Sequence, residues 1–278
     1  MRPVHFYKMT GSGNDFVALD GRETTVADWT PEAIRAACDR RTGVGADGLV
    51  ILTPEGRDGV RMTFFNNDGS PAGMCGNAAL CSTRLAHRIG LVAGTEMSLY
   101  TESGTLQTRC VGPGWMAELL LNDFDLPALV DVPLRPGEHW VTRCTVGVPH
   151  GVVLVDDLAS TDVVGRGREL RRDPAFAPGG ANINFVGRDS STGGGVAWRV
   201  RTYERGVEGE TMACGTGTVG AAFALAERGL VELPVRIASW HGNVFSVAGR
   251  IEGRRAVGPW LCGEGRMVFE GEGLISPS

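Results

Sequence analysis

The feature that most constrains this chain is an internal repeat. The segment CGNAALCSTRLAHRIGLV at residues 75–92 aligns without gaps with CGTGTVGAAFALAERGLV at residues 214–231. Both copies open with Cys-Gly and close with Gly-Leu-Val, and their cysteines lie 139 residues apart, half the length of the 278-residue chain. A repeat at this spacing predicts two similar halves, each built on the same supersecondary unit.

Each copy predicts a helix of about four turns. The second copy carries apolar residues at helical spacing, namely Val219, Phe223, Ala226 and Leu230, and between the first three of them lie the small residues Ala221, Ala222 and Ala224. This pattern is typical of a helix that is buried nearly all round. Gly90 and Gly229 stand where a glycine in the left-handed conformation commonly ends a helix.

The segments around the helices predict short strands. Residues 61–65 and the alternating segment 196–201 each precede a polar loop and then the repeated cysteine. Further short strands are expected at residues 97–100, 235–240 and 244–247, and one after Gly265 that can return to either half. We therefore expect two similar α/β halves, each with a sheet packed around one central helix. The predicted domains are 1–120 with 265–278, and 121–264, with the proline-rich stretch 122–137 as the crossing.

Composition excludes several classes of protein. The formal net charge is −5 and the sequence pI is about 5.6. The only dense basic cluster spans residues 168–172, so a nucleic-acid partner is not expected. No apolar stretch approaches the roughly 18 residues of a membrane span, and no export signal precedes the first motif. We therefore expect a cytoplasmic protein that does not bind membranes.

The cysteines indicate neither a disulfide framework nor a metal site. They number seven, an odd count, in a chain without an export signal. There is no C-x-x-C and no H-E-x-x-H motif, so no zinc site is predicted. Most of these thiols are expected to be small buried apolar groups.

A dinucleotide-binding loop is the alternative interpretation of residues 215–220, which read G-x-G-x-x-G. That fingerprint requires a strand that ends directly at the first glycine. Here a polar loop of about ten residues intervenes, and the first copy of the repeat keeps only the Cys-Gly pair. We therefore expect no nucleotide cofactor.

What the two copies share is a cysteine at the start of a helix. The unpaired N–H groups and partial positive charge of a helix N-terminus lower the pKa of a thiol and bind a carboxylate. Two such sites suit one reaction: one thiolate removes the proton beside a carboxylate, and the other thiol returns a proton to the opposite face. The alternative is that Cys75 and Cys214 are inert core residues.

Several separated motifs resemble the diaminopimelate epimerase family. They are MTGSGNDF (9–16), FNNDGSPAGMCGN (65–77), VGVPH (146–150), ANINF (181–185), YERGVEGETMACGTG (203–217) and WLCGEGRMVFEGEG (260–273). The resemblance implies an α+β fold of two pseudo-symmetric domains, each a mostly antiparallel sheet around a central helix. It also implies a cofactor-independent, two-base epimerisation of LL-2,6-diaminopimelate to the meso form, in lysine and peptidoglycan precursor synthesis.

The resemblance assigns roles residue by residue. Cys75 and Cys214 match the two catalytic thiols, and His150 and Glu204 match the pair that tunes them. The positions that match substrate-binding groups are Asn14, Asn66, Gly76, Asn77, Asn182, Glu204, Arg205, Gly215 and Thr216. Among these, the fork of Arg205 suits the distal carboxylate of the substrate.

Two departures from the family pattern leave the substrate open. Val148 stands before Pro149 where the family commonly has a substrate-contacting asparagine, and Gly48 stands where many members carry glutamine. A racemase of another amino acid, such as histidine, is therefore an alternative on the same fold. A thiol redox protein is a third and more remote alternative. The expected partner is a small amino-acid substrate, and a homodimer stays open.

Overall fold

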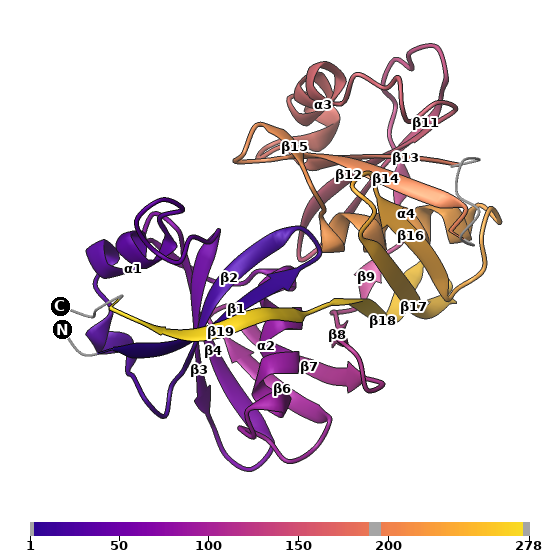
Figure 1. Cartoon of the computed structure of the whole chain (residues 1–278). Helices are drawn as coiled ribbons and strands as arrows, with labels where there is room; N and C mark the ends of the chain where they lie inside the picture. Colours follow the sequence, from indigo (N-terminus) through magenta and orange to yellow (C-terminus); the bar gives the residue numbers. More distant parts are fainter. Residues whose placement is uncertain (1–2, 189–195, 275–278) are drawn as a thin grey trace. The chain divides into compact units, whose positions relative to one another are not determined.

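Two units of matching topology make up the structure, a computed structural model that describes residues 3–188 and 196–274 (Figure 1). Contacts between residues divide the chain into Met1–Leu119 with Cys262–Ser278, called unit 1 below, and Leu120–Leu261, called unit 2. The strands β8 (Met116–Leu120) and β18 (Arg255–Glu264) run across the two boundaries.

Unit 1 holds one sheet and two α-helices. Its helical segments are η1 (Val26–Asp28), α1 (Pro31–Cys38) and α2 (Gly76–Arg88). Its strands are β1 (Val4–Gly11), β2 (Asn14–Asp20), β3 (Gly48–Pro54), β4 (Gly59–Asn66), β5 (Pro71–Ala72), β6 (Glu96–Thr101), β7 (Gly104–Val111) and β19 (Arg266–Gly273). The order across the sheet is β19–β1–β2–β3–β4–β6–β7, with β5 on the end of β4.

Unit 2 repeats this plan. Its helical segments are α3 (Val163–Arg171), η2 (Pro174–Phe176) and α4 (Gly215–Glu227). Its strands are β9 (Phe124–Asp125), β10 (Ala128–Leu129), β11 (Glu138–Val146), β12 (Val148–Val155), β13 (Asn182–Arg188), β14 (Trp198–Glu204), β15 (Gly209–Thr211), β16 (Val235–Ser239) and β17 (Val244–Glu252). The order is β10–β11–β12–β13–β14–β16–β17, with β15 on β14 and β9 on β18.

The two sheets correspond strand by strand. From β1 to β7 the pairings run antiparallel, parallel, antiparallel, parallel, antiparallel, and from β11 to β17 they run in the same sequence. Each cysteine follows a short strand, β5 or β15, and precedes the long helix of its unit. This confirms the predicted fold class of two pseudo-symmetric, mostly antiparallel α+β halves. The strand after Gly265 returns to unit 1, where the yellow β19 of Figure 1 lies beside the indigo β1.

One helix lies at the centre of each unit. In unit 1, α2 packs against β1, β7, β19 and their neighbours, and in unit 2, α4 packs against β11, β12, β13 and β17. Residues from Gly217 to Leu225 of α4 are all buried, as the alanine-rich pattern predicts. Gly90 and Gly229 follow the two helices with φ of 71° and 67°, so the predicted left-handed helix ends are confirmed.

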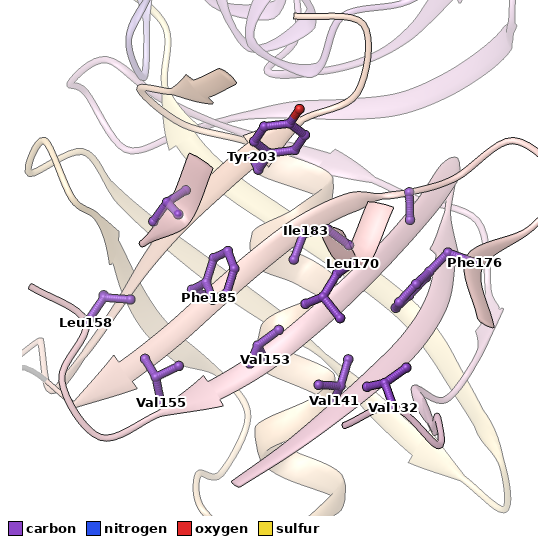
Figure 2. Packing of buried hydrophobic residues seen from close by; sticks show 12 residues of the cluster. Val132, Val141, Val153, Val155, Leu158, Leu170, Phe176, Ile183, Phe185 and Tyr203 are labelled. Atoms are coloured by element: carbon purple, nitrogen blue, oxygen red, sulfur yellow. The ribbon is translucent and has the colours of Figure 1, made fainter. Parts of the chain in front are cut away.

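The opposite face of each sheet is covered by the other helix of the unit. In unit 2, Leu170 of α3 packs on Val153, Ile183 and Phe185 of the sheet (Figure 2). In unit 1, α1 covers Val17, Leu49 and Ile51 in the same way. Because side chains alternate along a strand, Gly151, Ile183 and Tyr203 face α3 while His150, Asn182 and Asn184 face α4. This alternation presents a row of polar side chains to the central helix of unit 2.

Candidate active site

Cys75 and Cys214 occupy the same position in the two units. Each is the N-cap residue of its central helix, with extended backbone dihedrals (φ −137°, ψ 122° for Cys75; φ −128°, ψ 106° for Cys214). Neither side chain caps its helix by a hydrogen bond. A Cβ added to Gly76 would meet nothing within 4 Å, so the space in front of that helix start is open to an incoming group. Both helix starts therefore offer amide donors beside a sulfur.

In unit 1 the structure brings Asn14 and Asn77 together. Asn77 Nδ2 donates to Asn14 Oδ1 at 2.8 Å, and Asn14 Nδ2 donates to Asp47 Oδ2 at 2.9 Å. Asn77 is buried, and its Oδ1 has no hydrogen-bond partner in the described part of the chain. A buried acceptor left without a donor is costly, which makes this oxygen a candidate ligand contact beside Cys75. Asn66 instead bonds Ser70 Oγ in its own turn, at 3.0 Å.

A charged cluster behind Asn14 was not predicted from the sequence. Asp15 accepts hydrogen bonds from Lys8 at 2.7 Å and from both terminal nitrogens of Arg40 at 2.9 and 2.7 Å. Arg40 also bonds Asp47 at 2.8 Å, and Asp47 in turn holds Asn14. Burial would raise the pKa of Asp15, but the bonds from Arg40 and Lys8 hold it well below its ordinary value. These contacts join residues 7 to 33 positions apart, so no local pattern reveals them.

In unit 2, Glu204 and Asn182 surround Cys214. The charge of the Glu204 carboxylate acts on the Cys214 thiol, and this carboxylate accepts hydrogen bonds from Asn182 Nδ2 at 3.1 Å and from Thr211 Oγ1 at 3.2 Å. Asn182 Nδ2 lies 4.0 Å from Cys214 Sγ. Burial raises the pKa of Glu204 above its ordinary value. A carboxylate so placed and so tuned suits a general base for the thiol.

The lowered thiol pKa expected at the helix start is wrong for Cys214 in the free protein. Burial, followed by the charge of Glu204, raises the pKa of Cys214 to about 12. The Gly217 amide and the Thr216 hydroxyl act in the opposite direction but are the weaker influence. Desolvation therefore outweighs the helix N-terminus, and Cys214 is a neutral thiol before substrate arrives.

His150 is fully buried and reaches Cys214 through Thr216. His150 Nε2 lies 3.0 Å from Thr216 Oγ1, which lies 3.7 Å from Cys214 Sγ. On the other side of the ring, Nδ1 lies 3.3 Å from Asn184 Nδ2. Burial, and secondly the charge of Arg205, lowers the pKa of His150 to about 3, so the imidazole is neutral. Asn184 was not singled out in the sequence, although it stands in the same ANINF motif as Asn182.

Arg205 is tied to the same network by its backbone. Its N–H donates to Asn182 Oδ1 at 2.8 Å, and its guanidinium donates to the carbonyl of Gly180 at 3.3 Å. A cavity of about 570 Å³ within unit 2 is lined by Pro149, His150, Phe176, Gly179 and Gly180, among others. The guanidinium thus lies at Gly180, on the margin of a space that a small ligand can enter.

The glycines of the G-x-G-x-x-G segment have packing roles. A Cβ on Gly217 would meet Asn184 Oδ1 at 2.1 Å, and one on Gly220 would meet Cys144 Sγ at 2.9 Å. Gly217 therefore makes room for Asn184 against the start of α4.

The two departures from the family pattern are visible in the structure. Val148, the first residue of β12, is 38% exposed and offers no hydrogen-bonding side chain. A Cβ on Gly48 would come within 2.5 Å of both the Phe64 ring and the Phe65 carbonyl. Glutamine at position 48 would therefore require its neighbours to move.

Comparisons with known protein families single out one family. Its model, described as diaminopimelate epimerase, matches residues 6–116 and 142–252, one segment in each unit. The diaminopimelate epimerase of Gemmatimonas aurantiaca is 42% identical over 284 residues, which cover 97% of this chain and 99% of that protein. The enzyme of the same name from Aquifex aeolicus is 35% identical over 254 residues, covering 88% and 89%.

Solved structures share the fold at low sequence identity. A PhzF-family phenazine biosynthesis protein of Bacillus anthracis superposes with a TM-score of 0.74 at 14% identity, covering 99% of this chain and all of that one. A hydroxyproline epimerase of Agrobacterium vitis, solved with trans-4-hydroxy-L-proline, has a TM-score of 0.62 at 19% identity, covering 98% and 92%. No helix in residues 3–188 or 196–274 is both long and apolar enough to cross a membrane.

Proposed function

The chain belongs to the diaminopimelate epimerase family, and from this premise we propose that it interconverts LL- and meso-2,6-diaminopimelate with two cysteines and no cofactor. That it is an amino-acid epimerase follows from the family. The observation that supports the finer proposal is the placement of Cys75 and Cys214 as N-cap residues of matching helices, with the charge of Glu204 acting on Cys214.

The proposed chemistry balances its protons on named atoms. Glu204 takes the proton of Cys214, so an S–H bond breaks and an O–H bond forms. The Cys214 thiolate then removes the proton from the substrate α-carbon, and the Cys75 thiol returns a proton to the opposite face. In the reverse direction the two sulfurs exchange roles. The charge that develops on the α-carboxylate is stabilised by the N–H groups of a helix start.

The raised pKa of Cys214 makes the thiolate depend on substrate. In the free protein the proton rests on sulfur, because the buried thiolate is disfavoured. The α-ammonium group of a bound amino acid brings a positive charge next to the sulfur, and a nearby opposite charge favours the thiolate. We therefore expect the base to form only in the complex.

Substrate recognition is assigned to the side chains around the two sulfurs. Asn77 Oδ1, which accepts no hydrogen bond from the residues that the structure describes, is an acceptor for an ammonium group. Arg205 is suited to the distal carboxylate, since its guanidinium presents paired donors. Asn14, Asn66 and Asn182 supply further amide groups, while Gly76, Gly215 and Thr216 supply helix-start amides. Such an enzyme would act in lysine and peptidoglycan precursor synthesis, on a free amino acid in the cytoplasm.

A racemase of another amino acid is the second candidate. It is favoured by Val148 and Gly48, which remove two polar side chains that the family commonly turns towards its substrate. The experiment below separates the two candidates.

Incubation of the protein with LL-diaminopimelate in D2O, without pyridoxal phosphate, tests the proposal. We expect deuterium at one α-carbon together with conversion to the meso form. Cys75→Ala and Cys214→Ala should each abolish conversion, while Cys110→Ala, a buried thiol of β7, should retain it. Deuterium exchange on another amino acid, without exchange on diaminopimelate, would identify that amino acid as the substrate instead. Exchange that survives both cysteine substitutions would overturn the two-thiol mechanism.

A further inference from the structure

A chain of polar side chains crosses the buried face of unit 2 beneath α4. Thr202 Oγ1 donates to Asn184 Oδ1 at 2.9 Å, Asn184 Nδ2 approaches His150 Nδ1, and His150 Nε2 approaches Thr216. Asn184 and His150 are 0% exposed and Thr202 is 2% exposed. Burying three polar side chains needs a reason, because each requires its own partners.

The strand registers identify the equivalent positions in unit 1. In unit 2 the first residue pair of the parallel strands β12 and β13 is His150 with Asn182. In unit 1 the first pair of the parallel strands β2 and β3 is Phe16 with Gly48, so His150 corresponds to Phe16. Their partners Asn182 and Gly48 then correspond to each other. Two residues further along these partner strands, Asn184 corresponds to Val50.

The position in unit 1 that is equivalent to Thr202 follows from the antiparallel strand pairs. Asn184 pairs with Thr202 as Val50 pairs with Phe64, so Thr202 corresponds to Phe64. In unit 1 the rings of Phe16 and Phe64 pack edge to face, with their centroids 5.9 Å apart.

At equivalent positions of the sheet face that packs on the central helix, unit 1 therefore has apolar side chains and unit 2 has hydrogen-bonded polar side chains. Packing the sheet against its central helix does not need the polar set, because Phe16, Val50 and Phe64 fill those positions in unit 1. The helices match this difference: Ala78 of α2 stands where α4 has Gly217, whose missing Cβ leaves room for Asn184. The polar chain is therefore specific to what unit 2 does.

The direction of the hydrogen bonds can be assigned from one backbone carbonyl. Asn184 Nδ2 lies 2.9 Å from the Gly151 carbonyl oxygen, which can only accept, so that end of the amide is the donor. Its second hydrogen then points to His150 Nδ1, which must accept. A neutral imidazole with Nδ1 as acceptor carries its proton on Nε2.

The same logic continues to the sulfur. The Nε2–H group donates to Thr216 Oγ1, so the single hydroxyl proton of Thr216 is left for another acceptor. The remaining neighbour of that hydroxyl is Cys214 Sγ at 3.7 Å. A hydroxyl that donates to sulfur stabilises the thiolate relative to the thiol.

We propose that Asn184 is a positioning residue for the epimerisation: it holds His150 in the Nε2–H form, so that Thr216 donates its hydroxyl proton to Cys214. The inference rests on the proposed function in taking Cys214 as the thiolate that this bond stabilises. His150 stays neutral because burial and Arg205 lower its pKa to about 3. One more acceptor faces the ring, the backbone of Val146.

The tautomer of His150 can be measured without substrate. Long-range ¹H–¹⁵N NMR spectra of histidine-labelled protein, compared with those of His150→Gln, identify this ring among the five histidines of the chain. At pH 7 we expect a neutral ring with the proton on Nε2. In Asn184→Leu, which keeps the volume but removes the donor, the Nδ1–H form should gain population. A wild-type ring with its proton on Nδ1 overturns the proposal.

Kinetics then test whether the tautomer matters to Cys214. Thr216→Val and Asn184→Leu should each lower kcat by about 10- to 100-fold, the range for losing a hydrogen bond to a charged group. Thr216→Ser, which keeps the hydroxyl, should restore most of the rate. If Asn184 acts through Thr216, the double variant Asn184→Leu/Thr216→Val should be no slower than Thr216→Val alone.

A matched control separates this role from general stability. Thr142→Val removes a hydroxyl that is equally buried in β11, outside the polar chain, and should leave kcat unchanged. Additive losses in the double variant would contradict the proposal and indicate a structural role for Asn184. Wild-type protein with the Nε2–H tautomer but no epimerase activity would refute the proposed function and leave the tautomer assignment standing. Epimerase activity in a protein whose His150 carries its proton on Nδ1 would refute the tautomer assignment and leave the proposed function standing.

Discussion

Burial, and after it the charge of the Glu204 carboxylate, raises the pKa of the Cys214 thiol. Asn182 and Thr211 hold that carboxylate in place, at 3.1 and 3.2 Å. The pKa of the carboxyl is raised and the pKa of the thiol is about 12, so the proton rests on sulfur until a ligand changes the balance. This pair leads to the first prediction.

Glu204→Gln should slow epimerisation by about 100-fold or more, since general base catalysis commonly contributes 10²- to 10⁴-fold. Glutamine keeps the size and one acceptor of the side chain, so the fold should be retained. Deuterium exchange at the α-carbon measures the effect. Glu210→Gln is the control, because Glu210 forms an ion pair with Arg201 at 2.7 Å. An exchange rate equal to wild type would remove Glu204 from the mechanism.

Asp47→Asn should weaken substrate binding more than it slows the chemical step. Asp47 accepts from Asn14 Nδ2, and this bond orients the amide that we assign to the substrate. We expect KM to rise by about 10-fold, the size of one net hydrogen bond, with a smaller change in kcat. Steady-state kinetics check this, with Asp58→Asn, a mainly exposed aspartate of unit 1, as the control. A fall in kcat at constant KM would contradict the positioning role.

Gly217→Ala should destabilise the protein. The added Cβ would meet Asn184 Oδ1 at 2.1 Å, and overpacking of a close-packed interior typically costs about 1–3 kcal/mol. Gly76→Ala is the matched change at the start of α2, where the new Cβ meets nothing within 4 Å. Urea denaturation should show a loss for the first variant and none for the second. Equal stability of both variants would mean that Asn184 moves aside freely.

Stability should fall as the pH drops from 6.5 towards 3 because of His150. The folded pKa is about 3 and the ordinary value is 6.5, so in this window the unfolded chain binds a proton that the folded chain does not. Stability linked to this group is complete above pH 6.5, and about 2 kcal/mol of it should be lost between pH 7 and pH 5. Denaturation of wild type and His150→Gln at the two pH values checks this. The pH-dependent loss should be smaller in the variant, and equal losses would contradict a buried neutral histidine.

The repeat predicted more of this protein than any other feature of the sequence. Aligning Cys75 with Cys214 predicts the helix starts, the helix ends at Gly90 and Gly229, and the strands before each cysteine, and the structure has them all. These features depend on local periodicity and on glycine conformation, which a single sequence displays directly.

The electrostatics around the thiols could not be predicted in this way. A helix start alone suggests a lowered thiol pKa, yet Cys214 is shifted upwards, because its burial and its distance to Glu204 exist only in the folded chain. The same holds for the cluster of Lys8, Asp15 and Arg40, which joins three separate segments around Asn14.

The two-fold repetition, the cysteine before each central helix and the family were all predictable from the order of the residues. The side chains that lie beneath each helix were not, because they come together only in the folded chain. Parallel strand pairing in unit 2 brings Asn184 beside His150, while in unit 1 the rings of Phe16 and Phe64, on the two strands that flank β3, pack edge to face. The physical reason is that a hydrogen bond between residues 34 positions apart depends on strand register, and register is set by the whole sheet rather than by local sequence.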